Sequence, residues 1–164
     1  MGRRINAATA ALGSAPSCST LASCSAIGIG TDWAASDNAM DMLAETRLAA
    51  MIGKHVADDP TALPIRTMLR LATIDGARTL GIDHVVGSVE AGKHADLVVL
   101  DLDLPEANPQ HDLAANLLYS MTPRCVRDVM VDGRLLVRGG KLTGDDLGAL
   151  KRDRARRWPV WREQ

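Results

Sequence analysis

The spacing of apolar residues changes at Val85, and this change constrains the fold more than any other feature of the sequence. Upstream of it, apolar side chains recur at helical spacing over about residues 40–56 and again from Pro64 to Gly81. This pattern predicts two amphipathic helices, separated by the breaker sequence Asp58-Asp59-Pro60. Gly76 inside the second helix costs about 1 kcal/mol relative to alanine, so it predicts a tight crossing or a break there.

Downstream of Val85 the pattern is that of strands. Residues 95–101 contain a central run apolar enough to be covered on both faces, and glycine-rich residues 87–93 before it form a predicted turn. Two further β-rich runs, 126–131 and 134–138, flank Asp132-Gly133. Asp-Gly between two such runs is the strongest short signal for a hairpin. The sequence therefore predicts an α/β chain with helices first and strands after them.

Asp32 ends a short apolar run at residues 26–32. Gly28 and Gly30 in this run would let another backbone approach closely, which favours a short buried strand. A carboxylate at the carboxyl end of a buried strand is where α/β folds place ligands and catalytic groups. The alternative is structural, because an aspartate at that point can also form a turn or cap a helix.

Composition excludes several classes of function. The 19 Lys and Arg residues nearly balance the 20 Asp and Glu, and there are only three Trp, one Tyr and no Phe. Nothing here predicts a nucleic-acid partner or a membrane partner, and we expect the basic run 151–157 to be a solvated helix face.

The odd set of Cys18, Cys24 and Cys125 predicts free thiols in a reducing, cytoplasmic location. None of the four histidines, His55, His84, His94 and His111, forms an H-x-H or H-E-x-x-H pair.

Several motifs follow one another in order over residues 27–142. They are Gly28–Asp32, Ser36–Asn38 with Met40–Met42, Ala72–Arg78 with Leu80-Gly81, Gly87–Val99, His111-Asp112 and Val126–Arg134. Together they resemble the C-terminal part of the amidohydrolase superfamily. The branch they resemble contains the methylthioadenosine/S-adenosylhomocysteine deaminases, the triazine hydrolases and the guanine and cytosine deaminases.

The resemblance implies the C-terminal remnant of a (β/α)₈ metal-dependent hydrolase barrel, followed by part of a small β-sandwich. Residues 27–82 would hold the last barrel strand and the C-terminal barrel helices, and residues 83–142 the sandwich strands and hairpin. Residues 143–164 would form a C-terminal helix and tail, whereas residues 1–26 are poorly specified and do not resemble the family. A complete barrel needs about 250 residues, more than this chain has.

The resemblance also implies a role for Asp32. The family's aspartate after the eighth barrel strand binds a divalent metal, zinc or iron, and moves the hydrolytic proton. The substrate class would be an aromatic N-heterocycle, such as a purine, pyrimidine or triazine, cleaved at a C–N or C–Cl bond. Trp33 and Asp37 depart from the residues familiar at those positions, which leaves the substrate open.

The family's other metal ligands have no counterpart in this sequence. Its H-x-H pair, two later histidines and glutamate belong upstream of the aspartate, and the 31 residues before Asp32 contain no His and no Glu. A catalytic zinc needs three or more protein ligands. We therefore expect a truncated chain that is inactive alone, and that forms a homo-oligomer or needs a missing N-terminal portion. The alternative is a non-catalytic fragment that acts as an assembly or complementation module.

Overall fold

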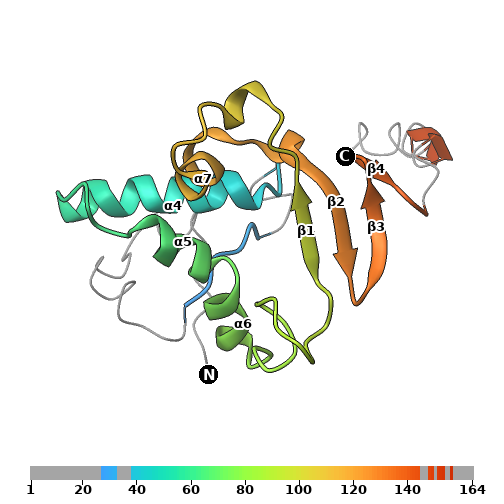
Figure 1. The fold of residues 1–164 in the computed structure, drawn as a ribbon, viewed down its shortest axis with the longest axis horizontal. Coiled ribbons are helices and arrows are strands. Elements are labelled where there is room, and N and C mark those ends of the chain that lie inside the picture. The colour runs from blue at the N-terminus through green and yellow to red at the C-terminus, as the bar shows by residue number, and fades with distance from the viewer. Residues whose placement is uncertain (1–26, 33–37, 145–147, 150, 154–155, 157–164) are drawn as a thin grey trace.

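A computed structural model describes residues 27–32, 38–144, 148–149, 151–153 and 156 of the chain. Within this part, helices come first and an antiparallel sheet follows, as the sequence predicts. Figure 1 shows α4, α5, α6 and α7 gathered on the β1 side of the sheet, with the other strands extending away from them. No helix in the described ranges is long and apolar enough to cross a membrane.

The first predicted helix is confirmed as α4, Met42–Ala57. Asp41 caps its N-terminus, because its Oδ1 accepts hydrogen bonds from the backbone N–H of Leu43 at 2.9 Å and of Ala44 at 3.1 Å. Such a side-chain acceptor satisfies donors that the first turn leaves without a partner. The helix ends at Asp58, whose φ of 49° is left-handed.

The second predicted helix divides into α5, Ile65–Leu71, and α6, Ile74–Leu80. The break lies at Ala72-Thr73, where Thr73 leaves helical geometry with φ −129° and ψ −103°. Gly76 lies within α6 and marks a tight crossing instead. A Cβ atom on Gly28 would lie only 2.7 Å from the Cα of Gly76, so these two backbones touch.

The prediction of a strand at residues 26–32 is wrong for the part that is described. Residues 27–32 adopt no regular strand, although Ile27 is buried at 5% exposure. The backbone N–H of Ile29 donates to the carbonyl of Leu71 at 3.1 Å. A strand requires a ladder with a neighbouring strand. The segment is bonded here to the end of a helix, and none of the described strands pairs with it.

The sheet has four strands in the order β1-β2-β3-β4, all antiparallel. They are β1, Leu97–Leu100; β2, Val126–Val131; β3, Arg134–Arg138; and β4, Lys141–Leu142. The predicted hairpin is confirmed, because Asp132 and Gly133 both have positive φ, 50° and 73°, as a type I′ turn requires. The expectation that β1 is covered on both faces is wrong, since Val98 is 57% exposed and Val99 is 40% exposed.

Residues 101–125 connect β1 to β2 through short helical turns. These are η1, Pro105–Ala107; α7, Leu113–Ala115; η2, Asn116–Ser120, which is π-helical; and η3, Pro123–Cys125. Arg47 of α4 ties this connection to the helices. Its guanidinium donates to the carbonyl of Leu118 at 2.9 Å and to that of Met121 at 2.5 Å.

Two hydrophobic clusters form the interior of the described part. The first joins α4, α5 and η2 through Ile27, Ala50, Leu63, Met68, Leu71 and Leu118. The second lies under the connection and is built from Ala107, Met121 and Cys125. Of the helix predicted near the C-terminus, residues 148–149, 151–153 and 156 are helical, and the others lie outside the described residues.

Candidate functional site

Asp32 lies at the end of the segment that crosses Gly76. Its side chain is exposed, and its φ of 59° is left-handed. A residue with a side chain rarely adopts this conformation, although aspartate tolerates it better than most. The hydroxyl of Thr31 donates to the Asp32 carbonyl at 3.4 Å, which is a weak contact. The structure therefore places the carboxylate at the surface.

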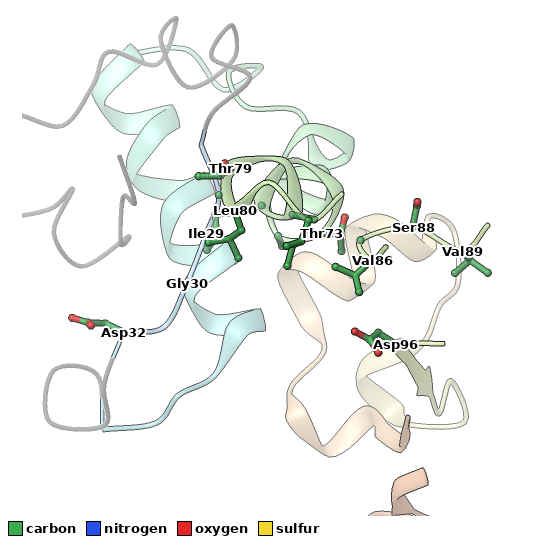
Figure 2. Close-up of a pocket in the computed structure, with 16 residues that line it drawn as sticks. Ile29, Gly30, Asp32, Thr73, Thr79, Leu80, Val86, Ser88, Val89 and Asp96 are labelled. Carbon is green, nitrogen blue, oxygen red and sulfur yellow. The ribbon is translucent and has the colours of Figure 1, made fainter. Parts of the chain in front are cut away.

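A hollow of about 900 Å³ lies beside the same segment. Gly28–Asp32 forms one wall, α6 forms another, and Val86–Val89 closes the far side. Figure 2 shows Asp32 at one end of this hollow, with its carboxylate turned away from the other labelled side chains. Asp96 lies near the opposite end, where its Oδ1 accepts a hydrogen bond from the backbone N–H of Asp132 at 2.7 Å.

The described residues do not by themselves form a metal centre. Nowhere in the described ranges do three His, Cys, Asp or Glu side chains gather closely enough to hold an ion. A catalytic zinc takes three protein ligands and leaves one position open. Asp32 can therefore supply one ligand, and the others have to come from elsewhere.

The histidines do not join Asp32. All four are exposed, and His94 Nδ1 lies 3.2 Å from Asp132 Oδ1 at the hairpin turn. Of the cysteines, Cys125 is buried and free, and burial raises the pKa of its thiol. A buried thiol with a raised pKa is a poor nucleophile. Cys18 and Cys24 lie outside the described residues.

A hydrogen-bonded network of three side chains beside the hollow, Ser88, Glu90 and Lys93, was not predicted from the sequence. Lys93 Nζ donates to Ser88 Oγ at 2.6 Å, and Ser88 Oγ donates to Glu90 Oε1 at 2.5 Å. The Ser88 hydroxyl, followed by the Lys93 charge, lowers the pKa of the Glu90 carboxyl. An ammonium 3.5 Å from a carboxylate is a poor general base for the serine. The network stabilises the turn before β1. The glycine-rich sequence of residues 87–93 predicts that turn.

The chain matches the family described as Amidohydrolase family over residues 10–136, a range that includes part of segment 1–26 and Asp32. It is 42% identical over 132 residues to the 5-methylthioadenosine/S-adenosylhomocysteine deaminase of Moorella thermoacetica, covering 80% of this chain and 31% of the relative. An adenosine deaminase from Xanthomonas campestris with bound zinc has a similar structure. Its TM-score is 0.77 at 42% identity, over 82% of this chain and 30% of that one.

An atrazine chlorohydrolase from Arthrobacter aurescens, complexed with zinc, has a TM-score of 0.71 at 30% identity. The match covers 80% of this chain and 29% of the chlorohydrolase. The chain thus spans about a third of the length of the relatives it matches. Because the family match extends over most of the sequence and includes the predicted site residue, the chain belongs to the amidohydrolase family.

Proposed function

We propose that this chain contributes the eighth-strand aspartate and the C-terminal sandwich region to a metal-dependent hydrolase of aromatic N-heterocycles. The observation that carries the proposal is the 42% identity and TM-score of 0.77 with a zinc-bound adenosine deaminase. The family match includes Asp32, which supports its assignment as the metal-binding and catalytic residue. The similarity to deaminases favours cleavage of a C–N bond of a purine. The similarity to a chlorohydrolase leaves cleavage of a C–Cl bond of a triazine as the second possibility.

In this proposal residues 27–82 correspond to the last barrel strand and the barrel helices, and residues 83–142 to the sandwich. A barrel strand becomes regular when it pairs with its neighbours, and none of the described strands pairs with residues 27–32. The divalent ion of the assembled enzyme, zinc or iron, is not held by the described residues alone. Asp32 has the chemistry required of it, because an exposed carboxylate can accept a proton from water and return it to a leaving amine.

The proposal requires further polypeptide, beyond the described residues, that carries the remaining ligands. We expect the purified chain to show no deaminase activity when it is alone with zinc or iron. The experiment mixes it with the portion of the Moorella thermoacetica deaminase that has no counterpart here, in the presence of zinc. Ammonia release is then measured with methylthioadenosine, S-adenosylhomocysteine and adenosine. The expected result is activity in the mixture only.

Asp32→Asn tests the site residue in the same mixture. Removing a carboxylate that binds the metal and moves the proton is expected to lower activity at least about 10³-fold. Asp103→Asn, at an exposed aspartate in the loop after β1, is the matched control and should retain activity. Full activity with Asp32→Asn would contradict the role of Asp32, and activity of the chain alone would contradict the need for further ligands.

The second candidate is a non-catalytic assembly or complementation module. It is favoured by the fact that no three ligand-type side chains come together in the described ranges. This reading predicts that the two polypeptides associate, as measured by co-purification, but that the mixture releases no ammonia from any of the three substrates. A cytoplasmic location is proposed for either candidate on the basis of the free Cys125 thiol.

A further inference from the structure

The carbonyl of Leu71 lies at the corner between α5 and α6. In an uninterrupted helix this carbonyl would accept a hydrogen bond from the backbone N–H four residues later. The chain leaves helical geometry at Thr73, and the Leu71 carbonyl accepts from the backbone N–H of Ile29 at 3.1 Å instead. The break between the two helices therefore leaves an acceptor that segment 27–32 uses.

The same corner makes the other close contact with this segment. The Cα of Gly76 faces Gly28, where an added Cβ atom would lie only 2.7 Å away. Asp32 follows Ile29 by three residues, which span at most about 11 Å of chain. Figure 2 shows the chain running from Ile29, beside α6, through Gly30 to Asp32. The position of the corner therefore sets where the Asp32 carboxylate is presented.

A network of three charged side chains holds the corner. Asp75, in the first turn of α6, accepts two hydrogen bonds from Arg70 of α5, at 3.1 Å from Nε and at 2.8 Å from Nη2. Arg78 of α6 donates from Nη1 to the same Oδ1 at 2.6 Å. The Asp75 side chain is only 15% exposed. Most surface ion pairs stabilise little, but a bidentate arginine–carboxylate pair within a network is the exception.

We propose that Asp75 is a positioning residue for Asp32 and acts through the angle between α5 and α6. Its pair with Arg70 crosses the break and joins the two helices, whereas its pair with Arg78 lies within α6. Asp75 is not among the residues that line the hollow, so it acts through the backbone and not by contact with a substrate. The catalytic consequence rests on the proposed function, whereas the placement of segment 27–32 does not.

Two arginine variants of the full chain form the matched test, because each removes one positive charge from the same carboxylate oxygen. Arg70→Gln breaks the link between the helices, and Arg78→Gln leaves it in place. Amide hydrogen exchange is measured at Ile29 by NMR, with the buried Ala50 of α4 as an internal reference. We expect Arg70→Gln and Asp75→Asn to speed exchange at Ile29 about 10-fold, since a hydrogen bond to a charged group changes an equilibrium by roughly that factor. Arg78→Gln should have a smaller effect, and exchange at Ala50 should not change.

The amide chemical shift of Asp32 is the second readout. It reports the left-handed conformation of that residue and needs neither metal nor substrate. The shift should move in Arg70→Gln and stay in place in Arg78→Gln. Equal acceleration at Ile29 and Ala50 would indicate a general loss of stability and would overturn the proposal. Equal behaviour of the two arginine variants, or an Asp32 shift that does not move, would overturn it as well.

The reconstitution with zinc tests the catalytic consequence. Asp75→Asn should lower kcat for methylthioadenosine about 10-fold and leave KM unchanged, because it displaces the carboxylate that moves the proton and touches no substrate. Asp83→Asn is the control, since its carboxylate is 42% exposed and lies 3.7 Å from Arg78 without joining α5 to α6. A rise in KM with kcat unchanged would overturn the positioning role. If the unaltered mixture releases no ammonia, the proposed function fails, and the exchange rates and the Asp32 shift still decide whether Asp75 positions the segment.

Discussion

The helical region and the sheet use similar apolar residues with opposite results. Ala50 and Met68 in the helices are 0% and 1% exposed, whereas no residue in the four strands is buried. An amphipathic helix buries its single apolar stripe against one neighbour. A sheet has two faces, and a layered domain covers at least one of them with another layer. In the described part the helices share a buried core, whereas the strands supply only partly buried side chains, Leu100 and Val126, to the second cluster.

The comparison is tested most strongly by truncating one methionine in the helical core. Met68→Ala removes a side chain that is 1% exposed in the first cluster, so it loses apolar burial and leaves a cavity. We expect a loss of about 2–5 kcal/mol in the free energy of unfolding. Met51→Ala, at a position of α4 that is 57% exposed, should cost less than about 0.5 kcal/mol. Urea denaturation measures both, and equal effects would contradict a self-contained helical core.

The parts of the fold that depend on residues close together in the sequence could be predicted from it. The α4 helix follows from the spacing of its apolar residues, and the β2–β3 hairpin follows from Asp132-Gly133. Residues 27–32 depend on distant partners, and their sequence alone does not show whether a neighbouring strand is present. The break at Ala72-Thr73 is not marked by a glycine or a proline, so the sequence alone does not show it.

The candidate site divides in the same way. Asp32 could be singled out because an acidic residue follows a short apolar run, and the family motifs around it gave that position a role. The Ser88, Glu90 and Lys93 network could not be singled out, because it depends on how the turn folds back on itself. The pairing of β1 with β2 is also hidden in the sequence, since it joins residues far apart in the chain.

The close crossing of Gly28 and Gly76 gives the next largest effect. Gly28→Ala adds a Cβ atom that would meet the Gly76 Cα at 2.7 Å, and backbone cannot move aside as a side chain would. We expect a loss of about 1–3 kcal/mol, measured by thermal or urea unfolding. Gly30→Ala is the matched control, because its Cβ atom would have nothing within 4 Å. Similar losses in the two variants would show that the segment does not cross α6 so closely.

The hairpin turn tests the sheet side of the comparison. Gly133 has a φ of 73° and its added Cβ would meet nothing within 4 Å, so any penalty comes from the backbone conformation alone. Gly133→Ala is expected to cost about 1–2 kcal/mol, and Gly133→Asn less, because asparagine tolerates the left-handed region. Hydrogen exchange of the β2 and β3 amides measures the effect locally. Equal exchange rates in the two variants would contradict the strain argument.

The smallest expected effect is a pH dependence at Asp128 of β2. The backbone N–H of Gly139, followed by the Arg127 guanidinium, lowers the pKa of the Asp128 carboxyl in the folded state. An unfolded aspartate has a pKa of about 3.9. The stabilisation is therefore fully present above that pH and is lost as the pH falls through the lower folded pKa.

Asp128→Asn should consequently reduce the urea midpoint near neutral pH, and the gap from the unaltered chain should narrow as the pH falls below about 3.9. Hydrogen bonds also lower the carboxyl pKa values of Asp59 and Glu90. These two groups titrate in the variant and in the unaltered chain alike, so their effect cancels in the difference between the two urea midpoints. Asp103→Asn removes an exposed aspartate outside the sheet and controls for the lost charge. A gap that stays constant with pH would mean that ionisation of the Asp128 carboxyl does not stabilise the folded chain.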